Sequence, residues 1–133
     1  MARNHRKLRV FHDAHKLTLA IYRETKGFPK DEWFGMRAQM RRAAVSVPSN
    51  VVEGNARRTT ADYLHFLYIA LGSACELQYL AGLAVDLELI PDAVGIQLAE
   101  RCDHVVRQLE RLAESMEDAL AAEREHKNRV GRR

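Results

Sequence analysis

A chain of 133 residues in which 47% of the side chains are hydrophobic and 29% are charged is the size of one domain, and its composition is too balanced for a disordered segment. A chain of this length buries roughly two-thirds of its unfolded surface, so it needs neither a disulfide nor a structural metal to fold. The formal net charge of +3 excludes a strongly acidic protein and is compatible with a polyanionic partner.

The segment 1–9 forms a basic amino-terminal arm with four basic residues and no acidic residue. A first helix is predicted from Val10 to Lys26, because its apolar residues recur at spacings of four and three, and Gly27 follows as a stop signal. These apolar residues are Val10, Ala14, Leu17 and Ile21. His12 and His15 lie one turn apart, and surface histidines explain them better than a weak metal site.

A second helix is predicted to begin near Asp31–Trp33. Its inner face consists of Met36, Met40, Ala43, Val47 and Val51. Pro48 lies within this pattern and predicts a kink, since it has no N–H for the carbonyl of Ala44. A polar stripe of small side chains, framed by an arginine and a glutamate, occupies the outer face: Arg42, Ser46, Ser49, Asn50 and Glu53. The stripe predicts either a polar contact between helices or subunits, or a site for a partner.

A third helix is predicted from Thr59 or Thr60 to about Leu89, and it is apolar on nearly every side. Between Tyr63 and Val85 its only charged side chain is Glu76. A helix of an isolated bundle normally shows water a broad polar face, so homo-oligomerisation is preferred over an exposed apolar patch. The predicted oligomer interface contains Leu64, Tyr68 and Leu71. Glu76 is expected to pair with an arginine of the second helix or of a neighbouring chain, and a functional site is the alternative.

A fourth helix is predicted from Pro91–Asp92, with apolar residues alternating at spacings of four and three. These residues are Leu98, Cys102, Val105, Leu109, Leu112 and Met116. The basic tail 122–133 is expected to fray. Four helices joined by short loops predict an all-α fold, an antiparallel up-down-up-down four-helix bundle over residues 10–121.

Two cysteines, Cys75 and Cys102, show no metal-ligand or redox spacing and indicate free thiols in a reducing compartment. No secretory segment is recognised at the amino terminus. The longest run without a strongly polar side chain, 66–75, is too short to span a bilayer. A soluble cytoplasmic protein without a membrane partner is therefore expected.

Charge is distributed unevenly along the chain. Residues 59–118 carry eleven acidic side chains against three arginines. Five arginines lie close together before this segment and are predicted to meet nucleic acid: Arg37, Arg41, Arg42, Arg57 and Arg58. Arg41 lies nearest the apolar faces and is expected to pair internally, with Glu76 as a candidate partner. Arg57 and Arg58 are expected to remain free.

The run RRAAVSVPSNVVEG, residues 41–54, followed by Arg57, is similar to the signature of bacterial four-helix bundle proteins encoded in 23S ribosomal RNA intervening sequences. A second block agrees: Tyr63, Phe66, Leu67, Ile69, Ala70, Gly72, Ser73, Glu76 and Leu77. The resemblance extends from about Phe11 to Leu120 and implies an antiparallel bundle assembled as a homopentamer. The same family includes the accessory variability proteins of diversity-generating retroelements, and that branch implies an RNA- or DNA-binding surface and a reverse transcriptase partner. The present chain is more similar to the intervening-sequence branch.

Catalytic motifs of hydrolases, P-loop proteins and zinc proteases are missing from the sequence. The nearest approaches to a di-iron pattern are Asp62-x-x-His65, which has the wrong acid, and Glu123-x-x-His126, which lies in the tail that is expected to fray. No catalytic residue, cofactor or metal is therefore expected, and the protein is not expected to be an enzyme. The predicted function is a nucleic-acid-binding accessory factor that contacts phosphates without reading bases. The alternative is a scaffold whose oligomeric ring docks a partner protein on the polar stripe.

Overall fold

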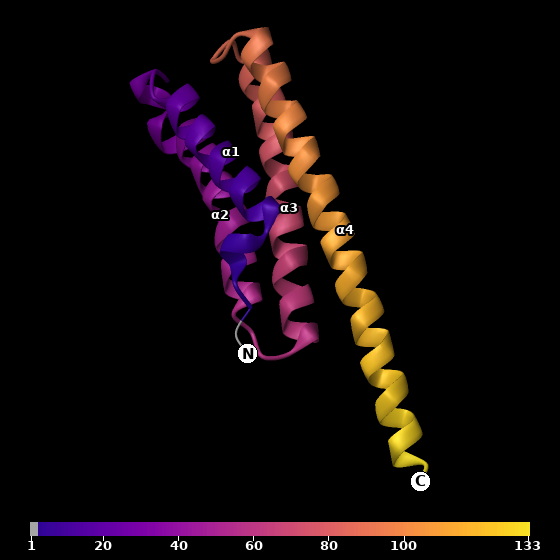
Figure 1. Ribbon diagram of the computed structural model, residues 1–133. Helices are drawn as coiled ribbons and strands as arrows, with labels where there is room; N and C mark the ends of the chain where they lie inside the picture. The colour runs from indigo at the N-terminus through magenta and orange to yellow at the C-terminus, as the bar shows by residue number, and fades with distance from the viewer. Residues whose placement is uncertain (1–2) are drawn as a thin grey trace.

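The computed structural model describes residues 3–133 and shows four long helices, with no strand in this part of the chain (Figure 1). The helices are α1 (Arg9–Thr25), α2 (Ala38–Asn55), α3 (Thr60–Asp86) and α4 (Asp92–Gly131). Short turns of helix precede α1 at His5–Lys7 and lie before α2 at Lys30–Glu32 and Trp33–Arg37. The predicted all-α class is confirmed.

Each helix packs beside two others. α1 contacts α2 and α4, and α3 contacts the same two helices, so α1 and α3 occupy opposite corners of the bundle. The α3–α4 loop lies at one end, and the turn between α2 and α3 lies at the other (Figure 1). The shared core draws its apolar side chains from all four helices, among them Leu17, Met40, Leu77 and Leu109.

Pro48 is accommodated inside α2, which runs through it as one helix. Pro48 cannot donate to the carbonyl of Ala44, and the hydroxyl of Thr18 on α1 donates to that carbonyl instead, at 3.0 Å. The backbone leaves helical geometry earlier, at Gly35, where φ is −101° and ψ is −108°. The helix thus continues through Pro48, where a kink was predicted, and the carbonyl that Pro48 leaves free shares the Thr18 hydroxyl with the carbonyl of Ala14.

Gly95 lets α4 approach α3 closely. It is buried, and a Cβ atom at this position would overlap Cγ2 of Val85 on α3. Gly82, also on α3, has open space around it. Two glycines near the same helix pair therefore have different physical roles.

A Gly95→Ala substitution is expected to lower the free energy of unfolding by ~1–3 kcal/mol, because the stiff Val85 side chain has to move away. The matched Gly82→Ala change, at an open helical position, should raise it by up to about 1 kcal/mol through helix propensity. Urea unfolding followed by circular dichroism measures both values. Equal effects from the two substitutions would contradict the close approach at Gly95.

The two cysteines are free and differ in their surroundings. Cys75 is exposed on α3, whereas Cys102 is fully buried on α4. Burial, with a smaller contribution from the neighbouring Cys75, raises the pKa of the Cys102 thiol to about 12. Cys102 is therefore a neutral thiol at physiological pH and packs as a small apolar side chain.

The ends of α3 and α4 differ from the sequence predictions. α3 ends at Asp86 rather than Leu89, and Glu88 turns the chain with a φ of +60°. The tail from Ala122 was predicted to fray, but α4 remains helical to Gly131. Its residues 121–133 are all exposed (Figure 1). Good helix formers continue this helix after its apolar contacts end.

Among the described residues, α3 is a helix that is long and apolar enough to cross a membrane. The sequence analysis had considered only the uninterrupted apolar run 66–75, which is too short for that. Core helices of globular proteins pass the same test. α3 packs between α2 and α4 and buries ten of its 27 residues, so the core accounts for only part of its apolar character.

Candidate nucleic-acid interface

Arg41 is a structural residue that joins α2 to the end of α1. Its Nε donates to the hydroxyl of Thr25 at 3.0 Å, and its Nη2 donates to the carbonyl of Tyr22 at 3.2 Å. The guanidinium also lies 4.5 Å from the centre of the Tyr22 ring. A cation is favourable here because the last carbonyls of a helix lack partners. Internal pairing of Arg41 was predicted correctly, but Glu76 was the wrong partner.

Arg37 lies in the turn just before α2 and stacks on an aromatic ring. Its guanidinium is 4.4 Å from the centre of the Trp33 ring, and the ammonium of Lys30 is 5.9 Å from it. The indole N–H of Trp33 donates to the carbonyl of Phe28 at 3.0 Å, which holds the ring in place. This end of α2 therefore presents two cations on a fixed aromatic platform.

Arg57 and Arg58 lie just beyond the other end of α2. Arg57 was expected to be free, but it pairs with Glu53 at 2.9 Å and lies 4.6 Å from the centre of the Phe66 ring. Arg3 adds a further cation by donating to the carbonyl of Arg57 at 2.8 Å. The Arg57–Glu53 pair is exposed, and such pairs contribute about 0.2–1 kcal/mol, so a phosphate can compete for Arg57. Arg58 is exposed.

The five arginines do not form one patch. α2 has 18 residues, and at about 1.5 Å per residue its two ends lie roughly 27 Å apart. Arg37 and Arg41 therefore belong to one basic end, and Arg57 and Arg58 belong to the other. Arg42 follows Arg41 directly and so lies at the same end of α2, but it is exposed and lines the groove between α2 and α3.

Part of the polar stripe of α2 faces α3 along a groove. The hydroxyls of Ser46 and Ser73 are hydrogen-bonded at 2.7 Å, and Asn50 donates to the Ser46 carbonyl at 2.7 Å. Arg42 and Glu76 line the same groove of about 320 Å³. The predicted pairing of Glu76 with an arginine of α2 is wrong, because this exposed carboxylate makes no ion pair within the described residues. Its pairing with a neighbouring chain stays a prediction. Ser49 and Glu53 lie exposed on the outer side of α2.

The outer face of α3 retains several exposed apolar side chains. Tyr68 is 46% exposed, Ile69 is 40% exposed, and Tyr79, which the sequence analysis missed, is 68% exposed. Leu71 is half-buried against the core. Leu64 was assigned to the oligomer interface, but it is only 8% exposed and packs inside the chain. The surface available to a second subunit therefore centres on the two tyrosines.

The end of α4 and the two residues after it form a projecting basic segment, residues 124–133, which we call the α4 arm. Glu123, the residue just before the α4 arm, contacts the bundle: its carboxylate accepts a hydrogen bond from the Thr60 hydroxyl at 2.6 Å. The α4 arm contains five Lys and Arg and one acidic residue. Without it the chain would carry 16 Lys and Arg against 17 Asp and Glu, a formal charge of −1. The net positive charge of the protein therefore resides in the α4 arm.

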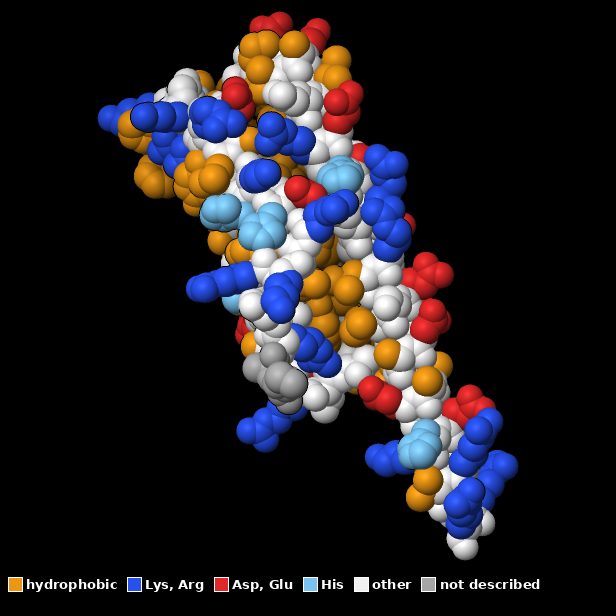
Figure 2. Space-filling model, viewed as in Figure 1, with side chains coloured by type: hydrophobic (Ala, Val, Ile, Leu, Met, Phe, Trp, Pro, Cys, Tyr) orange, Lys and Arg blue, Asp and Glu red, His pale blue; other side chains and the backbone are white. Residues whose placement is uncertain are grey.

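Figure 2 shows Lys and Arg side chains gathered over the α1 side of one face and again at the free end of α4. Acidic side chains lie around the α3–α4 end of the bundle and along the body of α4 (Figure 2). Within the described residues no three His, Cys, Asp or Glu side chains come together as a metal site.

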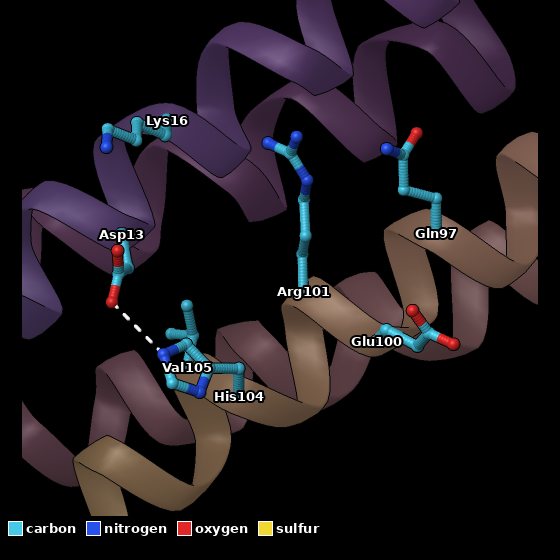
Figure 3. Close-up of a pocket in the computed structure, with 7 residues that line it drawn as sticks. All are labelled: Asp13, Lys16, Gln97, Glu100, Arg101, His104 and Val105. Atoms are coloured by element: carbon cyan, nitrogen blue, oxygen red, sulfur yellow. Dashed lines mark ion pairs between the residues drawn. The ribbon is translucent and has the colours of Figure 1, made fainter.

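A second polar groove, of about 430 Å³, lies between α1 and α4 (Figure 3). Its lining consists of Asp13, Lys16, Gln97, Glu100, Arg101, His104 and Val105. Asp13 accepts from Gln108 at 2.9 Å and lies 3.2 Å from Nε2 of His104. Sequence analysis missed this groove because its two walls are more than 80 positions apart along the chain.

Comparison with known proteins gives one family and a structural neighbour. A family model described as the 23S rRNA-intervening sequence protein matches residues 6–111. A search of curated proteins gives no match. A solved structure of a protein with unknown function, from the S23 ribosomal protein family of Bacteroides thetaiotaomicron VPI-5482, superimposes with a TM-score of 0.74 at 22% identity. The match covers 79% of this chain and 95% of that one, and at this identity it shows a shared fold.

Proposed function

The chain belongs to the 23S rRNA-intervening sequence protein family, and we propose that it is a nucleic-acid-binding accessory protein without enzymatic activity. In this proposal it acts in the cytoplasm as an antiparallel bundle assembled into a homopentamer. The ligand is RNA or DNA, held through its phosphates. The possible reverse transcriptase partner rests on resemblance to the retroelement accessory proteins alone.

The charge of the α4 arm is the observation that carries the proposal. Its ten residues supply a formal charge of +4 on an exposed helix, while the rest of the chain is close to neutral. Clustered cations on one element attract a polyanion through release of its counterions. In a ring of five subunits this charge would be repeated five times. Once one subunit had bound a nucleic acid, the next subunit would bind the same molecule at a high effective concentration.

The two basic ends of α2 extend this surface. Arg37 and Arg57 each lie over an aromatic ring, at 4.4 Å from Trp33 and 4.6 Å from Phe66. These rings orient the guanidinium groups, so less conformational entropy is lost when they bind phosphate. Contacts of this kind supply affinity without base recognition.

Binding to RNA over a range of salt concentrations tests the proposal. The protein is expected to retain nucleic acid during low-salt purification, seen as excess absorbance at ~260 nm, and to release it in ~1 M salt. Log affinity for a single strand should then fall with log salt at about −0.7 per phosphate contact. No binding at ~50 mM salt would contradict the proposal.

A protein-interaction scaffold is the second candidate, and the α2–α3 groove favours it. Arg42 and Glu76 lie exposed on the two walls of this groove. A partner protein could pair with both side chains at once. A scaffold should show no retained nucleic acid, and its binding to a partner should be lost on an Arg42→Ala substitution.

A further inference from the structure

The α1–α4 groove brings together hydrogen-bond donors from two helices. Lys16 comes from α1, and Arg101 and Gln97 come from α4. Figure 3 shows Arg101 and Gln97, one helical turn apart, both extending from α4 toward α1. Neither Lys16 nor Arg101 makes an ion pair with any residue from 3 to 133.

The acidic side chains of the groove make no ion pair with these cations. Asp13 already has two partners. Its carboxylate accepts a hydrogen bond from the side chain of Gln108 at 2.9 Å and lies 3.2 Å from Nε2 of His104. Glu100 extends sideways along α4 rather than across the groove toward α1 (Figure 3). Between Asp13 and Glu100 the groove therefore presents donors that lack an acceptor.

Burial increases the need for an anion. Arg101 is half-buried against the bundle, where its charge is less well hydrated than on an open surface. An incompletely hydrated guanidinium gains more from an anionic acceptor than a fully exposed one does. The groove volume of about 430 Å³ also suits a small organic ligand.

We propose that the α1–α4 groove is a binding site for a phosphate group, with Arg101 and Lys16 as the charged ligands and Gln97 as a further donor. A planar guanidinium matches two phosphate oxygens at once, and a lysine adds a mobile positive charge. His104 at the edge of the groove lies with its Nε2 3.2 Å from Asp13 and is not counted among the proposed phosphate ligands. The groove is open along α1 and α4, so it accepts either a free nucleotide or one phosphate of a nucleic-acid backbone.

Titration of the full-length protein with adenosine 5′-monophosphate, in a phosphate-free buffer, tests this site by calorimetry. Arg101→Gln and Lys16→Gln are each expected to weaken the affinity about tenfold, because hydrogen bonds to charged groups contribute strongly. Arg107→Gln is the matched control: it removes an α4 charge that pairs with Asp103 at 2.9 Å outside the groove, and it should change the affinity less than about twofold. Adenosine, which lacks the phosphate, should not bind.

A single-stranded RNA of ten nucleotides distinguishes the two sources of phosphate. If the monophosphate does not bind but Arg101→Gln weakens RNA binding, the groove holds a backbone phosphate, and the site then depends on the function proposed above. If the monophosphate binds and RNA does not, the groove site stands while the nucleic-acid function fails. Binding of both ligands that is unchanged by Arg101→Gln and Lys16→Gln, or binding of neither, would overturn the site.

Discussion

Deleting residues 124–133 is expected to weaken binding to a single-stranded RNA by about 100-fold or more at ~50 mM salt. Arg129 is engaged by Glu125 at 2.7 Å, which leaves four other cations of the α4 arm to contact phosphate. Because log affinity falls with log salt by about 0.7 per contact, each phosphate contact raises the affinity roughly tenfold at ~50 mM salt relative to 1 M salt. Loss of two to three contacts therefore gives the expected change, and the salt slope should flatten by about 1.4 to 2.1.

Two controls separate the α4 arm from net charge in general. Replacing its five Lys and Arg by Gln keeps a good helix former at each position and should reproduce the deletion. Arg107→Gln combined with Arg111→Gln removes two charges from the body of α4 and should have a much smaller effect. If the deletion changes neither the affinity nor the salt slope, the α4 arm is not the interface.

The order of the helices was predictable because the apolar spacing of this chain is regular. The first helix was predicted at 10–26 and lies at Arg9–Thr25. The end of α4 was not predicted, since the apolar pattern stops before the helix does. Beyond that point helix propensity and the Arg129–Glu125 pair, one turn apart, support the helix in water.

The partners of the charged side chains could be predicted only in part. The position of Arg41 between the apolar faces of α2 correctly indicated an internal role. Its acceptors are a carbonyl and a hydroxyl at the end of α1, and a helical projection of α2 does not show which helix lies beside that position. Leu64 was assigned to the oligomer interface, but it is buried within the chain, because a projection of α3 likewise does not show which sides its neighbouring helices cover. The α1–α4 groove depends wholly on tertiary packing and has no local signal.

A Tyr68→Asp substitution is expected to reduce the oligomeric state, because it places a carboxylate on the exposed apolar face of α3. Tyr68 is 46% exposed in the single chain, so the change should leave the bundle folded. An unpaired charge buried at a subunit contact costs about 3–5 kcal/mol, which weakens association by roughly 100- to 4,000-fold. Light scattering at micromolar concentration measures the mass, and Tyr79→Asp, farther along the same face, should act in the same direction.

Leu19→Asp provides the matched control on the opposite corner of the bundle. Leu19 is 52% exposed on α1. Both α1 and α3 pack against α2 and α4, but from opposite sides of the bundle. The same carboxylate there should leave the mass unchanged, because the proposed interface lies on α3. If light scattering shows that the wild-type protein is a monomer, the exposed face of α3 is not an interface between copies of this chain. A stable oligomer that survives both tyrosine substitutions but dissociates with Leu19→Asp would move the interface to α1. The exposed tyrosines of α3 would then need another partner.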